Sequence, residues 1–313
     1  MQKRNLGGSG LSVSPIVFGG NVFGWTLDEK ASFRMLDQFV AAGFNAIDTA
    51  DTYSRWAPGN KGGESESIIG RWLKAEPSRR EKVAIFTKTG MEMPGRGIGL
   101  KKERILKAVD EALQRLGTDH IDLFFSHKAD PETPIAETLD AYDTVLKAGK
   151  VRTIGASNYS PAELKEAFDV AKAQGLPRYE VLQPEYNLHD RRFEADYLPL
   201  VKEEGIGVVP YFSLASGFLT GKYRTAADIG GKARGRMVEK YMNARGEAVL
   251  KALDAVAARH GGDHAAVALA WLLAKDGVTA PIASATSDRQ LATFSKAVEL
   301  KLSPGDMALL DAA

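Results

Sequence analysis

The chain has 313 residues, of which 44% are hydrophobic and 26% charged, and its formal net charge is +1. This composition is typical of a globular protein with a large core, and the small net charge gives no reason to expect a nucleic-acid or membrane partner. The absence of cysteine excludes disulfides, thiolate catalysis and cysteine-based metal sites. Because no hydrophobic run is long enough to span a membrane and no secretory signal is visible, we expect a cytoplasmic protein.

Short hydrophobic strands alternate with amphipathic helices along the chain, after a short ribbon expected over residues 1–15. Strands are expected at 16–20, 44–48, 83–88, 121–125, 151–155, 180–183, 206–210 and 279–283. Helices are expected at 28–42, 64–73, 101–116, 134–148, from 160 onward, and at 195–204, 245–259, 264–275, 288–298 and 303–311. Loops are expected at 90–100 and 221–236.

Eight strand-then-helix units favour a parallel sheet, and eight is the number that closes a (β/α)8 barrel. A doubly wound open sheet gives a similar alternation, but the first strand lacks the Gly-x-Gly-x-x-Gly turn that opens such a fold's dinucleotide site. No linker or low-complexity stretch divides the chain. We therefore predict one α/β domain over 1–313, a (β/α)8 TIM barrel with a short N-terminal ribbon and additional C-terminal helices.

Ionisable residues follow three of the expected strands: Asp48 and then Tyr53, Lys88, and His127. Parallel strand ends meet at one mouth of a barrel, so these side chains are expected to converge there. Lys88, oriented by Asp48, would lower the pKa of Tyr53, and His127 would hydrogen-bond a carbonyl oxygen. The set predicts a site that polarises a carbonyl and delivers a proton, with nicotinamide as the hydride donor. Taken singly, each residue also fits an ordinary structural role.

The segment 44–53 resembles the strand-2 signature of the aldo-keto reductases, which carries that family's catalytic aspartate and tyrosine. The family's lysine and histidine map onto Lys88 and His127, and 149–159 matches a further signature, so the resemblance covers essentially the whole chain. It implies reversible, NADPH-dependent reduction of an aldehyde or ketone to an alcohol, with a small-molecule carbonyl or alcohol substrate and Tyr53 as the general acid.

The same resemblance implies where the cofactor binds. Ser157, Asn158 and Gln183 would hold the nicotinamide carboxamide and Tyr211 would stack on its ring. The segment 214–222 would lie along the pyrophosphate. The cofactor residues expected in and just before it are Phe212, Ser213, Leu214, Ser216, Gly217 and Lys222. The family often has Tyr-Ser-Pro-Leu where this chain has Tyr-Phe-Ser-Leu at 211–214.

A third cofactor segment follows the last strand. Ser284, Thr286 and Arg289 fall where the family binds the adenosine 2′-phosphate, and arginine grips phosphate in a bidentate way. Ala283 stands where many members place a lysine. We expect NADPH, with NADH as the alternative. Arg289 equally fits a solvated position in the first turn of a helix.

Trp25, Trp56, Met91 and Met93 lie in the loops after the first three strands and are candidates for an apolar pocket wall, or for local packing. The histidine pair at 260 and 264 has metal-ligand spacing, but Gly261-Gly262 interrupts the helix that would align it, so no metal site is predicted.

Two other functions stay open, one from the residues and one from the family resemblance. A barrel-mouth lysine such as Lys88 also serves Schiff-base lyases. A nucleotide-sensing regulatory subunit with little turnover is the other alternative, because the family resemblance extends to β-subunits of potassium channels. The sequence indicates neither the physiological substrate nor an oligomeric state.

Overall fold

The structure is a computed structural model that describes residues 1–93, 95 and 97–313. Two residues of the loop expected at 90–100, Pro94 and Arg96, lie outside this description. Eight parallel strands run β10-β3-β4-β5-β6-β7-β8-β9 across one sheet. They are β3 (Val17–Gly19), β4 (Ala46–Asp48), β5 (Ala84–Thr89), β6 (Ile121–Ser126), β7 (Val151–Ser157), β8 (Val181–Gln183), β9 (Gly207–Val208) and β10 (Ile282–Ala283).

Backbone hydrogen bonds bring the two end strands of this sheet together. The amide of Thr279 donates to the Val208 carbonyl at 2.9 Å, and that of Ile282 donates to the Pro210 carbonyl at 2.9 Å. The sheet therefore curls back on itself, and the predicted (β/α)8 fold is confirmed.

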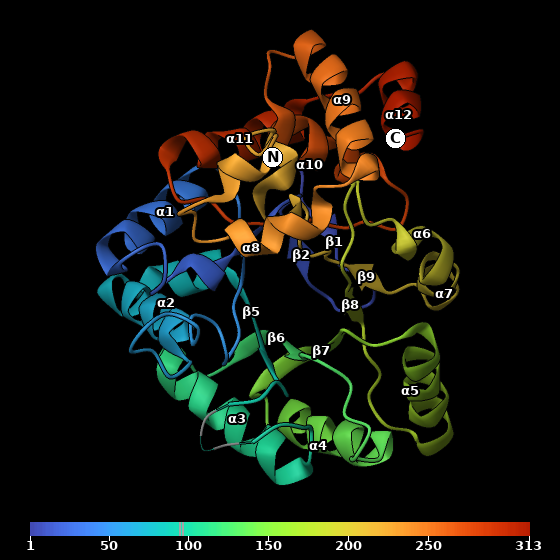
Figure 1. Cartoon of the computed structure of the whole chain (residues 1–313). Helices are drawn as coiled ribbons and strands as arrows, with labels where there is room; N and C mark the ends of the chain where they lie inside the picture. Colours follow the sequence, from blue (N-terminus) through green and yellow to red (C-terminus); the bar gives the residue numbers. More distant parts are fainter. Residues whose placement is uncertain (94, 96) are drawn as a thin grey trace.

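Helices form a ring around the strands (Figure 1). The α-helices are α1 (Glu29–Ala41), α2 (Glu64–Ala75), α3 (Lys102–Leu116), α4 (Ile135–Lys147), α5 (Pro161–Gln174), α6 (Arg192–Asp196), α7 (Leu198–Glu204), α8 (Gly235–Val238), α9 (Ala244–Arg259), α10 (His264–Ala274), α11 (Asp288–Glu299) and α12 (Pro304–Asp311). The 3₁₀ helices are η1 (Gly20–Val22), η2 (Pro77–Lys82), η3 (Ala215–Thr220), η4 (Ala226–Ile229) and η5 (Glu239–Tyr241).

Two expectations for individual elements are wrong. The single helix expected at 195–204 is divided into α6 and α7, because Pro199 has no amide hydrogen and its ring excludes a continuous helix through this point. The segment 221–236, expected to be a loop, contains η4 and the start of α8. A reciprocal cap explains η4, since the Asp228 carboxylate accepts hydrogen bonds from the Thr225 amide and hydroxyl.

The strands separate two hydrophobic cores. Successive strand residues face opposite sides of a sheet, so every second residue of β5 and β6 points into the barrel. Phe86, Leu123 and Phe125 belong to the cluster inside the barrel, whereas Ile85 and Phe124 belong to the larger cluster between the strands and the helices. This alternation decides which polar side chains at the strand ends face the barrel mouth.

The N-terminal ribbon closes the opposite end of the barrel. Strands β1 (Arg4–Asn5) and β2 (Ser12–Val13) pair antiparallel, and Leu6 joins the interior cluster. Gly207, the first residue of β9, lies so close to the ribbon that an added Cβ would be 2.7 Å from the Leu6 side chain. The ribbon thus blocks the end where the strands begin and leaves their C-terminal ends as the open mouth.

We predict that Gly70→Ala lowers the free energy of unfolding by about 1–3 kcal/mol, the usual cost of overpacking. Gly70 lies in α2 where it meets α3, and a Cβ there would overlap the Arg115 carbonyl oxygen. Alanine is the better helix former, so a stabilised variant would contradict this contact. The matched control is Gly230→Ala, whose Cβ would have no neighbour closer than 3.9 Å. Urea unfolding followed by circular dichroism measures both.

Candidate active site

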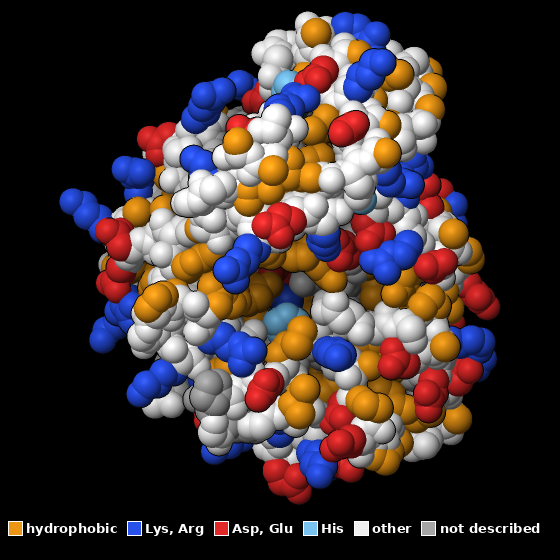
Figure 2. Space-filling model, in the orientation of Figure 1, with side chains coloured by type: hydrophobic (Ala, Val, Ile, Leu, Met, Phe, Trp, Pro, Cys, Tyr) orange, Lys and Arg blue, Asp and Glu red, His pale blue; other side chains and the backbone are white. Residues whose placement is uncertain are grey.

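The four residues expected to carry chemistry lie at the C-terminal ends of neighbouring strands. Asp48 is the last residue of β4, Lys88 is the penultimate residue of β5, and His127 directly follows β6. Tyr53 reaches the same place from the loop after β4. Figure 2 shows a hollow near the middle of the face it displays, with a histidine side chain visible in it and hydrophobic side chains around it.

The Lys88 ammonium group joins these residues. It donates to Asp48 Oδ1 at 2.6 Å, to the Thr49 carbonyl at 2.7 Å and to the Tyr53 hydroxyl at 3.1 Å, which uses all three of its hydrogens. The Tyr53 hydroxyl in turn donates to Asp48 Oδ2 at 3.1 Å. A phenol, an ammonium and a carboxylate therefore share one closed set of hydrogen bonds.

Burial governs the proton affinities in this set. Asp48 and Lys88 are each 1% exposed. Burial lowers the pKa of Lys88, and the adjacent Asp48 carboxylate opposes that shift. Burial and the Asp48 charge hold the pKa of Tyr53 well above its ordinary value. The expected lowering of the Tyr53 pKa is therefore wrong here, because burial and the Asp48 charge outweigh the effect of Lys88.

His127 faces Tyr53 edge-on, with 6.0 Å between the ring centroids. Burial, and secondarily the Lys88 charge, hold its pKa well below the ordinary histidine value, so the imidazole is neutral at physiological pH. Its Nδ1 atom is buried and has no hydrogen-bond partner among the described residues. A neutral ring in this position can donate one hydrogen bond to a ligand but cannot act as a cation.

The residues expected to hold the nicotinamide form one network that reaches Asp48. Ser157 Oγ donates to the Gln183 carbonyl at 2.9 Å, and Asn158 Nδ2 donates to the His127 carbonyl at 2.8 Å. The Tyr211 hydroxyl donates to Asn158 Oδ1 at 2.7 Å. Gln183 Nε2 donates to Asp48 Oδ1 at 3.0 Å. Gln183 therefore borders the Asp48–Lys88 pair directly, and Ser157 lies beside Gln183 in the same network.

The segment expected along the pyrophosphate has an unusual backbone. Phe212 and Ser216 have positive φ angles of 52° and 58°, and Gly217 has 99°. Such angles are uncommon for residues other than glycine and concentrate at functional sites. Ser216 Oγ is buried without a hydrogen-bond partner among the described residues, whereas Ser213 Oγ is engaged by the Pro210 carbonyl. The orphaned Ser216 hydroxyl marks a place where a ligand oxygen would fit.

Sequence reasoning missed Arg234 in this region. Its guanidinium lies over the Trp25 ring at 5.5 Å, and Lys222, Lys232 and Arg234 are close enough for their charges to interact. Partial burial and these neighbouring charges lower the pKa of Lys222. Within residues 1–93, 95 and 97–313, neither Lys222 nor Arg234 forms an ion pair. Cationic residues gathered without a carboxylate indicate an anion site. The cluster of basic residues at 221–236 was its only sequence signal.

The expected 2′-phosphate residues lie where β10 leads into α11. Ser284 Oγ contacts the Gly19 carbonyl and Asn21 Oδ1 at 2.7 and 2.8 Å. The Thr286 amide and hydroxyl both donate to the Gln290 side chain. The Arg289 side chain is exposed in the first turn of α11. Of the three, Arg289 is the one whose side chain has no hydrogen bond to the described residues of the protein.

The expected apolar wall divides into two parts. Trp25 and Trp56 pack edge-to-face at 5.5 Å, and Trp56 approaches Tyr53 at 6.2 Å while 47% of its surface stays exposed. Met93 is buried, and its methyl end packs against Gly62, so it serves local packing. The two tryptophans, not Met93, therefore border the open mouth beside Tyr53.

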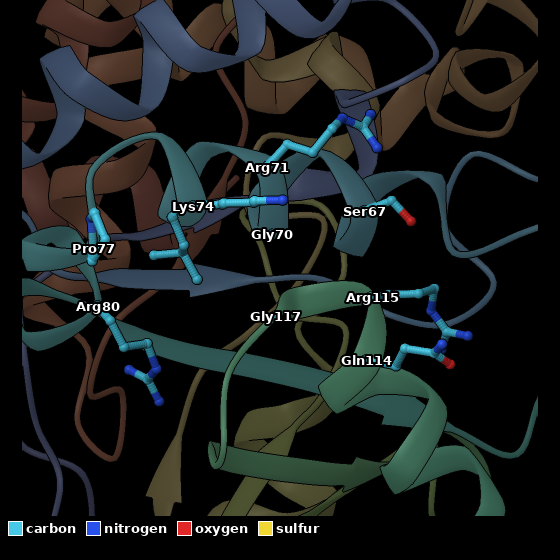
Figure 3. Close-up of a pocket in the computed structure, with 10 residues that line it drawn as sticks. Ser67, Gly70, Arg71, Lys74, Pro77, Arg80, Gln114, Arg115 and Gly117 are labelled. Carbon is cyan, nitrogen blue, oxygen red and sulfur yellow. The ribbon is translucent and has the colours of Figure 1, made fainter.

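A cavity of about 620 Å³ lies elsewhere, on the outer surface between α2, η2 and α3 (Figure 3). Its three arginines already have acidic partners: Arg71 contacts Glu29, Arg80 contacts Asp122 and Arg115 contacts Glu66. Residues that line it include Ser67, Gly70, Lys74, Pro77, Gln114 and Gly117. Because the Asp48–Lys88 set lies on the other side of the sheet, we place the functional site at the barrel mouth.

His260 and His264 do not converge on one site: they contact Asp306 and Asp254, at 3.0 and 2.6 Å. In the described part of the chain, no group of three or more His, Asp or Glu side chains is arranged to hold a metal ion. Nor does this part contain a helix with the length and hydropathy that crossing a bilayer requires.

Comparisons with known proteins identify the family of this chain. The model of the aldo/keto reductase family matches residues 15–313, and the chain belongs to that family. It is 34% identical to the uncharacterized oxidoreductase YrpG of Bacillus subtilis, over 99% of this chain and 95% of that protein. It is also 34% identical to a probable voltage-gated potassium channel subunit beta of Arabidopsis thaliana, over 96% of this chain and 92% of the relative. The versiconal hemiacetal acetate reductase of Aspergillus parasiticus is 30% identical, over 99% and 96%.

Family membership makes this chain an NAD(P)H-dependent oxidoreductase that acts on carbonyl compounds. The strand ends bring together the Asp, Tyr, Lys and His that the sequence pointed to.

We predict that Lys88→Met lowers the free energy of unfolding by about 3–5 kcal/mol, because it leaves Asp48 as an uncompensated buried charge. The double variant Asp48→Asn with Lys88→Met should recover at least half of that loss, since a neutral amide needs no counter-charge. Urea unfolding measures both variants. Equal stability of the single and double variants would show that the ion pair does not balance charge here.

Proposed function

We propose that the protein uses NADPH to reduce an aldehyde or ketone to an alcohol, reversibly, with Tyr53 as the proton donor. The observation that carries the proposal is the buried Lys88 ammonium, which binds the Asp48 carboxylate and the Tyr53 hydroxyl together at the barrel mouth. A carbonyl oxygen that lies beside Tyr53 meets a protonated phenol backed by a fixed cation.

The protonation states suit this role. The raised pKa keeps Tyr53 protonated at neutral pH, and an alkoxide is a stronger base than a phenolate, so the proton still moves to the product oxygen. Tyr53 must turn its hydrogen from Asp48 toward the substrate, and its oxygen then keeps the Lys88 hydrogen bond as negative charge develops on it. Neutral His127 is placed to orient the carbonyl by hydrogen bonding.

Two groups of residues near the barrel mouth fit the nicotinamide and the pyrophosphate of a dinucleotide. Gln183 Nε2 is committed to Asp48, so its carbonyl oxygen is the atom offered to a carboxamide, beside Ser157 and Asn158. The Ser216 hydroxyl and the cations Lys222 and Arg234, which have no hydrogen-bond or ion-pair partner of their own among the described residues, fit a pyrophosphate. When bound, the nicotinamide supplies the hydride that reduces the carbonyl carbon.

The preference for NADPH rests on the start of α11. Arg289 is exposed there, close in sequence to Ser284 and Thr286, and its guanidinium has no ion pair among the described residues. A helix N-terminus together with an arginine favours a phosphate dianion. We therefore assign these three residues to the 2′-phosphate, which NADH lacks.

The substrate side of the mouth favours an apolar carbonyl compound. Trp56 is half exposed and lies against both Trp25 and Tyr53. Aromatic faces next to a proton donor suit an aromatic or aliphatic aldehyde or ketone more than a highly charged one.

A regulatory role is the second candidate, because the chain is 34% identical to a relative named as a potassium channel subunit beta. A regulatory subunit would bind the dinucleotide tightly and turn over little. The lyase alternative fits less well: all three hydrogens of the Lys88 ammonium are bound, whereas a Schiff-base lysine needs a free amine.

We predict that Tyr53→Phe lowers kcat for aldehyde reduction by about 100-fold or more, the usual contribution of a general acid. The ring stays in place, so the dissociation constant for NADPH should hardly change. Steady-state NADPH oxidation with an aromatic aldehyde gives kcat, and fluorescence titration gives the dissociation constant. Unchanged turnover would remove Tyr53 from the mechanism, and tight NADPH binding by a wild type without turnover would favour the regulatory role.

We predict that Arg234→Gln and Arg289→Gln weaken cofactor binding in different patterns. Loss of a charged contact to phosphate costs about 10-fold or more in affinity. Arg234→Gln should weaken NADPH and NADH alike, because both carry the pyrophosphate, whereas Arg289→Gln should weaken NADPH alone. Fluorescence titration with both cofactors measures this. The control is Lys172→Gln, at an exposed lysine of α5. Identical losses for both arginine variants would overturn the assignment.

A further inference from the structure

Two buried carboxyl groups lie behind the end of β5, outside the set of residues that the proposed reaction uses. Asp51 Oδ2 accepts a hydrogen bond from the Thr89 hydroxyl at 2.8 Å, and Glu66 Oε1 accepts one from the Thr87 hydroxyl at 2.6 Å. Asp51 is 3% exposed and Glu66 is fully buried. Neither carboxyl group was singled out by the sequence.

Successive side chains of β5 point to opposite faces of the sheet, which places the two carboxyl groups behind Lys88. Lys88 points into the barrel, so its neighbours Thr87 and Thr89 point outward, toward α2 and α3. The two carboxyl groups therefore hold the strand from behind, one on each side of Lys88. Asp51 also donates its backbone amide to the Lys88 carbonyl at 3.2 Å. It thus ties the loop that carries Tyr53 to the strand that carries Lys88.

The charges of the two carboxyl groups are balanced to different degrees by their neighbours. Glu66 Oε2 accepts a hydrogen bond from Arg115 Nε at 2.6 Å, which pairs its charge. Asp51 Oδ1 is buried and has no hydrogen-bond partner within the described residues. The Asp51 carboxyl is thus half-satisfied, an arrangement that suits a protonated acid better than an anion.

The charged and titratable groups that act on Asp51 come from each neighbouring element. They are Glu66 on α2, Arg104 and Arg115 on α3, Lys88 on β5 and Tyr142 on α4. Burial, followed by the Glu66 charge, raises the pKa of Asp51 to about 7, and the Thr89 hydrogen bond and the two arginines oppose that shift. Asp51 thus changes charge near neutrality.

We propose that Asp51 is a positioning residue of the reductase site, which holds the Tyr53 loop against β5 and adjusts the electrostatic potential at Lys88 and Tyr53 by gaining or losing its own proton. This inference rests on the proposed function. Its structural basis is the Thr89 contact, the backbone bond to Lys88 and the unpartnered carboxyl oxygen.

The sign of the effect follows from the charges. Ionised Asp51 favours the charged form of Lys88. By Coulomb's law the same negative charge would also make the potential at the nearby Tyr53 phenol more negative. A more negative potential makes proton donation from Tyr53 harder and disfavours negative charge on the substrate oxygen. Reduction should therefore be faster when Asp51 is protonated, below its pKa, and slower above it.

The test compares the pH dependence of kcat for wild type and Asp51→Asn, with saturating NADPH and an aromatic aldehyde. Asparagine keeps an oxygen for Thr89 but cannot ionise. The ratio of kcat in Asp51→Asn to kcat in wild type should rise several-fold as the pH passes through about 7. The KM for NADPH should stay the same, because Asp51 lies on the outer side of the strand. A ratio that is independent of pH would overturn the inference.

Two matched variants should shift the pH at which kcat changes without abolishing that change. Thr89→Val deletes the hydrogen bond that stabilises the Asp51 anion, so the inflection should shift to higher pH. Glu66→Gln deletes the neighbouring charge that disfavours that anion, so it should shift to lower pH. Shifts in the reverse directions would contradict the assignment of the titration to Asp51.

An infrared titration reads the Asp51 proton without turnover. The protonated-carboxyl band that disappears as the pH passes through neutrality should be present in wild type and missing in Asp51→Asn. If the asparagine variant does not fold, the same band should move to higher pH in Thr89→Val. If wild type turns over and Asp51→Asn has the same pH dependence of kcat, this inference alone is contradicted. If wild type does not turn over at any pH, the proposed function is contradicted as well.

Discussion

The site depends on one buried ion pair between the ends of β4 and β5. Asp48 and Lys88 are 1% exposed, and their contact at 2.6 Å gives each buried charge an opposite partner. The lysine also binds the Thr49 carbonyl and the Tyr53 hydroxyl, so its position fixes the loop that follows β4. The pair orients the phenol and, through Gln183 Nε2, the residues around the nicotinamide position.

The barrel makes this pair possible because its strands are parallel and in register. Asp48 pairs with Phe86 in the β4–β5 ladder, which places the aspartate close to Lys88, two residues further along the inner face. The ribbon closes the other end, so the C-terminal strand ends form the open mouth at which Asp48 and Lys88 lie. The outer face of β5 has its own polar layer, in which Thr87 and Thr89 meet the carboxyl groups of Glu66 and Asp51. One strand thus carries Lys88 on its inner face and the contacts to two buried carboxyl groups on its outer face.

Much of this was predictable from the sequence, because strand periodicity and strand-end position are local properties. Asp48, Lys88 and His127 were identified by their places after hydrophobic strands, and the barrel by the count of strand–helix units. The rest depends on contacts between distant segments. Arg234 stands in a loop with no periodic pattern, and its relation to Trp25 arises only when the loop folds over the mouth. Asp51 reads as an ordinary loop aspartate until Thr89 and Glu66 enclose it. The expected direction of the Tyr53 pKa shift was wrong, because the burial that raises this pKa cannot be inferred from residue types alone.

The most direct test of the account is the fate of the transferred hydrogen. NADPH deuterated at C4 of the nicotinamide, on the face from which hydride leaves, is mixed with an aromatic aldehyde and the enzyme, and the product is examined by NMR. The account predicts an alcohol with one deuterium on the carbon that was the carbonyl carbon, made only when protein and cofactor are both present. An alcohol without deuterium, with each cofactor face labelled in turn, would contradict it.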